Sequence, residues 1–222
     1  MTLPNLAPIP ELFVSADSAQ KLKAEAGDLL SWDLTPRQIC DLELLMNGGF
    51  HPLKGFLTQA DYDSVVETMH LTTGDIWPIP VTLDVGQDFA DKVEPGQDIA
   101  LRDQEGVILA ILSVTDKWAA DKAREAEKVF GANDLAHPAV NYLHNKAGKV
   151  YLGGPVTGIQ QPVHYDFKSR RDTPNELRAY FRKVGWSKVV AFQTRNPLHR
   201  AHQELTFRAA KESQANLLIH PV

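Results

Sequence analysis

The spacing of apolar residues changes along this chain. A short polar helix is expected around residues 16–26, and between residues 35 and 69 apolar residues recur every three or four positions, which predicts two amphipathic helices. From residue 76 short alternating or continuous apolar runs predict strands instead. After residue 173 a helix, a strand, a helix and a strand are expected in turn. The pattern therefore indicates a mixed region of helices and short strands, followed by an α/β region.

The first two amphipathic helices have clear boundary signals. Thr35 can cap the first helix, Pro36 suits its first position, and Gln38 can complete a capping box. Gly48-Gly49 is expected to end this helix, and Thr58 to begin the next. The expected apolar faces are Ile39, Leu42, Leu45 and Met46 in the first helix and Tyr62, Val65, Val66 and Met69 in the second.

The middle of the chain predicts a small β-structure. Strands are expected over residues 79–85, 99–101, 107–114 and 149–152, and a helix over residues 121–130. The polar run Arg102–Gly106 predicts a hairpin between the second and third of these strands. Gly153-Gly154-Pro155 is expected to break the fourth strand. Short strands with peripheral helices indicate a compact, β-barrel-like domain.

A polar segment, Gln161–Asp172, marks the expected domain boundary, so we expect domains over residues 1–166 and 167–222. Thr173 then repeats the capping pattern and begins a helix that runs to Gly185. A strand, a helix and a strand are expected over residues 188–192, 197–213 and 217–220. Such a β-α-β unit places its two strands in parallel. We expect it to be the beginning of a larger α/β domain, because a complete doubly wound domain typically has about five strands.

The chain's most distinctive stretch lies in this last unit, where Val189–Phe192 predicts a buried strand that ends in the polar residues Gln193–Asn196. Asn196 suits the cap of the following helix, and Pro197 suits its first position. We therefore expect a sharp turn from strand into helix. The expected core face of that helix comprises Leu198, Ala201, Leu205 and Ala209.

The polar residues of this turn are suited to binding anions. A helix N-terminus presents unpaired N–H groups and a partial positive charge. Arg195 adds a planar charged fork, and His199 and His202 are spaced to share one helix face. Other interpretations remain open: the histidines could be solvated or form a metal pair, although no third ligand is near them. Arg195 could be a surface charge, and Thr194 could serve only in the turn.

Composition narrows the possible functions. The 222-residue chain has a formal net charge of −5 and a pI near 5.9, which argues against a general nucleic-acid or membrane-surface binder. The single cysteine, Cys40, cannot form an internal disulfide, and we expect it to be buried. Without a transmembrane-length apolar run or a signal peptide, we expect a cytoplasmic protein. Lys168, Arg170 and Arg171 are expected to form a solvated linker.

The string Gln193-Thr194-Arg195-Asn196-Pro197-Leu198-His199-Arg200-Ala201-His202 resembles the signature of the ATP sulfurylase (sulfate adenylyltransferase) family. The upstream segments Trp32–Gln38, Asn47–Phe50, Gly55–Leu57 and Trp77–Asp84 are similar to the N-terminal region of the same enzymes. The resemblance implies a PUA-like β-barrel domain with peripheral helices, followed by the start of a Rossmann-like nucleotidyltransferase domain.

The resemblance also implies a reaction, in which ATP and sulfate give adenosine 5′-phosphosulfate and pyrophosphate. Gln193 and Arg195 would bind sulfate, and Gln193, Thr194, Arg195 and Asn196 would bind ATP. Thr194, Arg195, Asn196, His199 and His202 would be the catalytic residues, with no metal bound by the protein itself. Magnesium would accompany ATP, held by phosphate oxygens and water.

The family also implies what lies outside this chain. A later Gly-Arg-Asp-His segment, which would complete the site, does not occur here. We therefore expect a piece of a longer protein that is inactive alone and forms a homo-oligomer when complete. Two other functions compete: a non-catalytic module that binds RNA or protein through its barrel, which the acidic balance disfavours, and a nucleotidyltransferase acting on a phosphopantetheine or nicotinate precursor.

Overall fold

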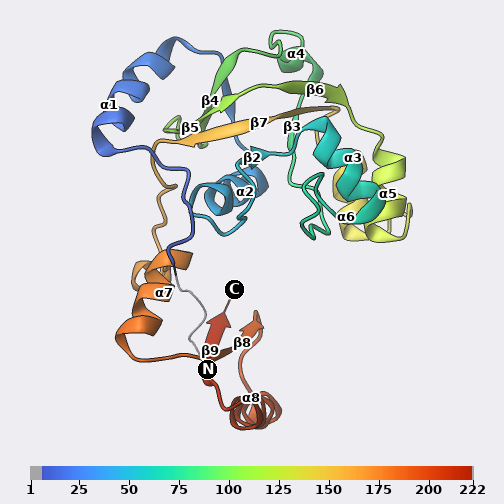
Figure 1. Ribbon diagram of the computed structural model, residues 1–222. Helices are drawn as coiled ribbons and strands as arrows, with labels where there is room; N and C mark the ends of the chain where they lie inside the picture. The colour runs from blue at the N-terminus through green and yellow to red at the C-terminus, as the bar shows by residue number, and fades with distance from the viewer. Residues whose placement is uncertain (1–6, 222) are drawn as a thin grey trace. The chain divides into compact units, whose positions relative to one another are not determined.

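The computed structural model describes residues 7–221, which divide into two compact units (Figure 1). Residues 10–166 form the first unit, and residues 167–221 together with residues 7–9 form the second. The first unit contains a mixed sheet with helices around it. The second contains two helices, a short 3₁₀ turn and a pair of strands. Among the described residues, no helix is long and apolar enough to cross a membrane.

The first unit matches the expected mixture of short strands and helices. Its helices are α1 (Ala16–Glu25), η1 (Ala26–Asp28), α2 (Pro36–Met46), α3 (Gln59–Thr68), α4 (Gln87–Ala90), α5 (Lys122–Phe130) and α6 (Pro138–Asn145). Its strands are β1 (Ser31–Asp33), β2 (Gly55–Phe56), β3 (Leu83–Val85), β4 (Asp98–Arg102), β5 (Ile108–Ser113), β6 (Asp116–Ala119) and β7 (Val150–Gly158). The sequence pattern did not predict α4, α6, β1, β2 or β6, which are all short.

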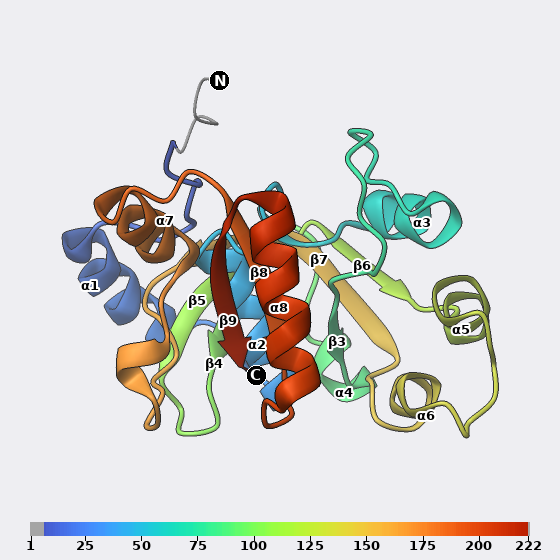
Figure 2. The same cartoon turned by 90° about the horizontal axis from the view of Figure 1, so that it is seen from below.

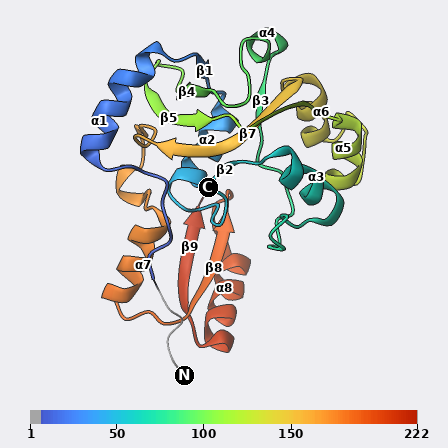
Figure 3. The same ribbon diagram turned by 45° about the horizontal axis from the view of Figure 1, so that its top comes forward.

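β7 organises the sheet of this unit (Figure 3). It pairs antiparallel with β2, β3, β5 and β6 at different points along its nine residues. The predicted β4–β5 hairpin is present, and β1 extends it as a parallel strand. α2 lies against β7, and α3, α5 and α6 gather at one end of the sheet. The result is a curled, half-barrel sheet.

The expected break at Gly153-Gly154-Pro155 is wrong, because β7 continues through it to Gly158. The glycines instead allow neighbouring backbones to approach. A Cβ on Gly154 would lie 2.0 Å from the carbonyl oxygen of Ser113, and one on Gly153 would lie 2.3 Å from that of Leu57. Gly154 also has a φ of 149°, which side chains disfavour. These residues let one strand pair with four partners.

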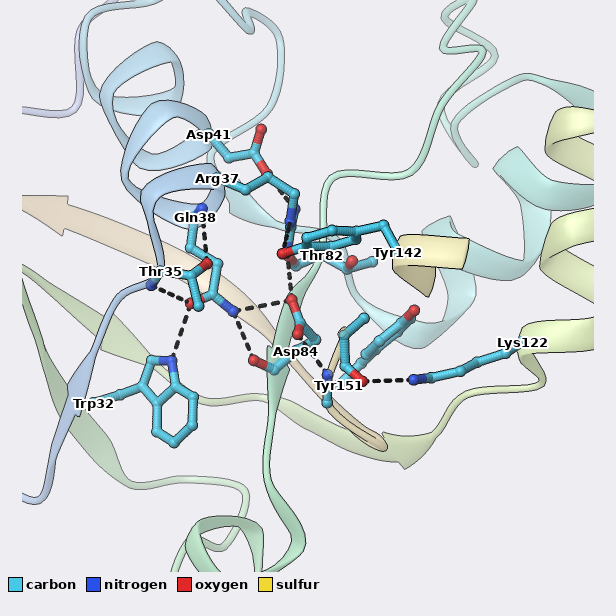
Figure 4. A network of polar contacts seen from close by, with 12 residues as sticks. Trp32, Thr35, Arg37, Gln38, Asp41, Thr82, Asp84, Lys122, Tyr142 and Tyr151 are labelled. Atoms are coloured by element: carbon cyan, nitrogen blue, oxygen red, sulfur yellow. Dashed lines mark hydrogen bonds and ion pairs between the residues drawn. The ribbon is translucent and has the colours of Figure 1, made fainter. Parts of the chain in front are cut away.

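The predicted start of α2 is confirmed in detail. Thr35 caps the helix, Pro36 is its first residue, and Gln38 completes the capping box. Gln38 is fully buried, and its amide nitrogen donates to the backbone oxygen of Asp84 at 2.7 Å and to the side chain of the same residue at 2.9 Å. The cap therefore also ties α2 to β3 (Figure 4).

Two burial predictions and the extent of one strand in this unit are wrong. Cys40 is exposed, because it faces away from the side of α2 that buries Leu42 and Leu45. Met69 is 58% exposed, because it follows the last residue of α3 in a left-handed conformation. The strand expected over residues 79–85 comprises only Leu83–Val85, and all three of these residues are buried.

The second unit contains the predicted β-α-β arrangement. Its elements are η2 (Lys168–Arg170), α7 (Pro174–Lys183), β8 (Val189–Thr194), α8 (Arg200–Ser213) and β9 (Asn216–Pro221). Thr173 and Glu176 form the predicted capping box of α7. β8 and β9 are parallel and pair from Val189 with Asn216 to Thr194 with Pro221. The predicted topology of strand, helix and parallel strand is therefore present.

Candidate active site

The turn between β8 and α8 differs from its predicted form. α8 begins at Arg200 with His199 as its cap, so Asn196 is not the cap and Pro197 is not the first helical residue. The backbone N–H of Asn196 donates to Thr194 Oγ1 at 3.0 Å, and this hydroxyl donates to the carbonyl oxygen of Asn196 at 3.2 Å. This local turn delays the helix, because it commits Asn196 to another conformation.

The burial predicted for this region is also wrong. β8 alternates between exposed and half-buried residues, with Val189 36% exposed. α8 covers the β8–β9 pair (Figure 2), and in the described part of the chain this pair is the whole of its sheet. Leu198 precedes the helix and is 50% exposed, and Leu205 is 57% exposed. The side of α8 that faces the strands instead carries His202 and the buried Thr206.

An open pocket of about 450 Å³ lies where β8 ends. Its lining comprises Phe192, Gln193, Thr194, Arg195, Asn196 and His202. Consecutive residues of an extended strand point to opposite sides, so the bend after Thr194 is needed to bring this run to one hollow. Gln193, Arg195 and Asn196 are exposed to solvent. The predicted polar residues therefore gather around a space that a ligand can reach.

His199 and His202 form a stacked pair beside this pocket. Their ring centroids are 3.8 Å apart with 26° between the planes, and His202 also lies 5.4 Å from the ring of Phe192. Nδ1 of His199 accepts a hydrogen bond from the N–H of Ala201 at 3.2 Å. A neutral His199 therefore carries its proton on Nε2. His202 Nδ1 is buried and has no hydrogen-bond partner among the described residues.

The electrostatic character of the turn is positive. The N-terminus of the 14-residue helix α8 contributes a partial positive charge. Arg195 and Arg200 add full charges, and both side chains are exposed. Within residues 7–221 no carboxylate forms an ion pair with Arg195, and the stretch 193–202 contains no acidic residue. Donors exceed acceptors here, as an anion site requires.

The same residues are poorly suited to holding a metal ion. Groups of three histidines, cysteines or acidic residues that could do so are absent from the part of the chain that the structure describes. The lining offers only neutral oxygens, from two side-chain amides and a hydroxyl, and not the carboxylates through which proteins usually hold magnesium. A metal pair at His199 and His202 is therefore disfavoured, because stacked rings do not converge on a common point.

The sequence pattern did not predict two features of this site. Phe192 was expected to be a core residue, yet it is part of the pocket lining. His199 was expected on the helix face, yet it caps the helix and is not among the lining residues. An aromatic residue at the end of a strand before a polar run was the available signal for Phe192. Nothing in the sequence pattern indicated that His199 would be the cap.

Comparison with known proteins agrees with the resemblance. A family model for a PUA-like domain matches residues 3–161, and the ATP-sulfurylase family model matches residues 168–222. A sulfate adenylyltransferase from Kluyveromyces lactis is 54% identical over 213 residues, which cover 94% of this chain and 42% of the relative. The sulfate adenylyltransferase from Saccharomyces cerevisiae is 52% identical over 200 residues, which cover 90% of this chain and 39% of the relative.

A solved structure is also similar. It is described as a hexameric APS kinase from Thiobacillus denitrificans, and it is 37% identical with a TM-score of 0.79 over 96% of this chain and 38% of that chain. The chain thus spans about two fifths of the length of the relatives that it matches.

The extent of the first family match shows that this chain is a PUA-like domain protein. With the second match and the named relatives, the chain belongs to the ATP sulfurylase family, of which it carries the PUA-like domain and part of the ATP-sulfurylase domain.

Proposed function

We propose that this chain carries one wall of the active site of a sulfate adenylyltransferase. In the reaction, a sulfate oxygen attacks the α-phosphorus of ATP, and the bond from that phosphorus to the bridging oxygen of the β-phosphate breaks. The products are adenosine 5′-phosphosulfate and pyrophosphate. Sulfate needs no deprotonation, so catalysis rests on positioning and on stabilising negative charge.

The polar residues of the pocket divide between the two substrates. Arg195 holds sulfate through two guanidinium N–H groups, and the side-chain amide of Gln193 donates to a further oxygen. Asn196, with Gln193 and Arg195, contacts the phosphates of ATP. The Thr194 hydroxyl is already engaged with the backbone of Asn196, so Thr194 acts by shaping the turn and presenting its oxygen there.

The histidine pair serves the leaving group. His202 lines the pocket, and His199 stacks on it with a proton available on Nε2. Both therefore donate hydrogen bonds to the phosphate oxygens as negative charge grows on the departing pyrophosphate. Thr194, Arg195, Asn196, His199 and His202 are the catalytic residues under this proposal.

One observation carries the proposal: the turn after β8 collects an unpaired arginine, two amides and an imidazole around an open pocket at a helix N-terminus. Only an anionic ligand satisfies so many donors at once. The family match over residues 168–222 supports ATP and sulfate as the particular anions.

Magnesium fits this site as a companion of ATP. The chain supplies no carboxylate within residues 193–202, so the ion's ligands are phosphate oxygens and water. The bound ion supplies charge neutralisation of the triphosphate. Arg195 and the N-terminus of α8 stabilise the negative charge of the triphosphate that the ion does not neutralise.

Several broader features belong to the same proposal. We place the domain boundary between residues 166 and 167, which is supported by the end of one family match at residue 161 and the start of the other at residue 168. The β8-α8-β9 unit is the start of a Rossmann-like nucleotidyltransferase domain. The complete protein is a homo-oligomer, as the hexameric neighbour supports. A cytoplasmic location and the absence of nucleic-acid and membrane partners stay predictions.

Sulfate-dependent exchange of labelled pyrophosphate into ATP tests the function. In the intact protein, Arg195→Ala should lower the rate by about 10²–10³-fold, the size of effect seen when one charge-stabilising donor is lost. Arg208→Ala is the matched control, because Arg208 is exposed and forms its ion pair with Glu204, one turn earlier in α8, and it should leave the rate unchanged. Equal rates for both variants would remove Arg195 from the site.

The 222-residue chain alone provides a second test. It should show no exchange, because its described strands β8 and β9 build only two strands of an α/β sheet that typically has five or more. Sulfate-dependent exchange by this polypeptide would contradict the assignment of the missing part of the site to the rest of the protein.

A further inference from the structure

A second pocket lies inside the unit formed by residues 10–166, and the proposed reaction does not use it. It has a volume of about 280 Å³, near the lower end for small-molecule sites. α2, β3, α5, α6 and β7 all contribute to its walls. Its polar lining includes Arg37, Asp84, Glu125 and Tyr142, and most of the remaining lining is apolar or aromatic.

The guanidinium of Arg37, which lines this pocket, is already paired with two carboxylates. Arg37 forms ion pairs with Asp41 at 2.5 Å and with Asp84, and it also donates to the carbonyl oxygen of Thr82 at 3.3 Å (Figure 4). Lys122 donates to the carbonyl oxygen of Ala147 at 2.7 Å. An anionic ligand would therefore have to displace a carboxylate, so the pocket is not an anion site.

Glu125 on α5 is in the opposite situation. Its residue is 7% exposed, and its Oε2 accepts hydrogen bonds from the hydroxyls of Tyr62 at 2.8 Å and Tyr151 at 3.0 Å. Its Oε1 has no hydrogen-bond partner among residues 7–221, and no lysine or arginine within that range forms an ion pair with it. The charges of Lys122 and Arg37 favour its ionised form, but burial outweighs them. A carboxylate that is removed from water without a cation in direct contact is costly.

The walls around this carboxylate suit a cation with an apolar body. The rings of Phe130, Tyr142 and Tyr151 line the pocket, and aromatic faces attract cations. Arg37 already lies 5.8 Å from the centre of the Tyr142 ring. Burial raises the pKa of Glu125, because removal from water disfavours the charged form of its carboxyl group. A ligand that brings positive charge would remove this penalty.

We propose that this pocket binds a small organic cation, a primary amine or amidine on an apolar body about the size of a phenyl ring, with its charged group against Oε1 of Glu125. The apolar body lies against Phe130 and Leu143, and Tyr142 closes over it. The site is independent of the anion pocket after β8, because its residues all belong to the other compact unit.

Three probes of the same shape test the charge preference in the unmodified chain. Benzylamine, benzyl alcohol and benzoate are titrated at neutral pH while the backbone amide signals of the protein are followed by NMR. Benzylamine should bind saturably and at least about tenfold more tightly than benzyl alcohol, the ratio expected from one charge-assisted hydrogen bond. Its largest shifts should fall on α5 and α6. Equal binding of the three probes, no saturable binding of benzylamine, or shifts elsewhere would overturn the proposal.

A pair of variants tests the role of Glu125 itself. Glu125→Gln keeps the shape of the side chain and should abolish the preference for benzylamine over benzyl alcohol. Glu105→Gln is the matched control, because Glu105 is exposed in the β4–β5 turn, away from the pocket lining, and its carboxylate accepts from Tyr165. This variant should keep the preference. A preference that survives in Glu125→Gln would refute the assignment. Circular dichroism checks the fold, and if Glu125→Gln does not fold, the three-probe comparison in the unmodified chain decides alone.

Discussion

The imidazole rings of His199 and His202 stack with their centroids 3.8 Å apart, and Nδ1 of His199 caps α8 through the N–H of Ala201. One residue therefore both ends the turn and fixes the position of the other imidazole. The sequence spacing alone places both histidines on one helix face, whereas the structure gives them different tasks. Substitutions of His199 can therefore test its role as a helix cap separately from the role of its imidazole ring.

Replacing His199 tests this dual role. His199→Ala removes the cap and should lower the free energy of unfolding by about 1 kcal/mol, as measured by urea denaturation of the 222-residue chain. His199→Asn supplies a good cap without an imidazole, and it should restore most of this stability.

Activity of the intact protein separates the two roles. Under the proposed function, both His199→Ala and His199→Asn should slow sulfate-dependent pyrophosphate exchange, since both lack the Nε2 donor. If His199→Asn were as active as the unmodified protein, the contribution of His199 would be capping alone.

The buried carboxylate of Glu125 predicts a pH dependence of stability. Burial raises its pKa above the ordinary value of 4.5, although hydrogen bonds from Tyr62 and Tyr151 and the positive charges of Lys122 and Arg37 partly oppose this. Between the unfolded and folded pKa values, the folded state binds more protons, so the free energy of unfolding falls as the pH rises. The contribution is complete below the unfolded pKa and is lost as the pH rises through the folded pKa.

Glu125→Gln removes this titration. Going from about pH 4 to about pH 7, the stability of the unmodified chain should fall relative to that of Glu125→Gln by about 1.4 kcal/mol for each unit of pKa shift. Thermal unfolding followed by circular dichroism at a series of pH values measures the difference. A line for Glu125→Gln that runs parallel to that of the unmodified chain would show that the carboxylate of Glu125 is not perturbed.

Gly154 in β7 should not tolerate a side chain. A Cβ there would lie 2.0 Å from a backbone oxygen, and the φ of 149° disfavours any residue but glycine. Gly154→Ala should therefore cost about 3 kcal/mol or more in the free energy of unfolding. Gly27→Ala is the control, because no atom lies within 4 Å of the added Cβ and its φ is not positive. Comparable urea midpoints for the two variants would contradict this account of β7.

Gln38 should matter more than the cap residue that it supports. Thr35→Ala removes one hydrogen bond at the start of α2 and should cost about 1 kcal/mol. Gln38→Ala leaves the N–H of Thr35, the indole of Trp32 and Asp84 without the partner that they share, so it should cost about 2–4 kcal/mol. Denaturation in urea measures the loss of stability in each variant. A larger loss for Thr35→Ala than for Gln38→Ala would mean that water replaces the hydrogen bonds of the buried Gln38.

Local signals were the most reliable part of the sequence analysis. The capping boxes at Thr35 and Thr173 and the glycine end of the helix at Gly131 are all present, because these interactions span only three or four residues. The polar run after β8 also gathers at one pocket as predicted. The break expected after Leu152 failed, because the reason for those glycines is the approach of strands that are distant in sequence.

By itself, the sequence determined where most helices begin, that a β-α-β unit lies in the last part of the chain, and that a polar run follows β8, because hydrogen bonds between near neighbours settle these features. Only the tertiary structure decided that β7 pairs with four strands, that His199 rather than Asn196 caps α8, and that the buried Glu125 lines a cavity. Each of these depends on which distant backbones and side chains come into contact, and no local pattern contains that information.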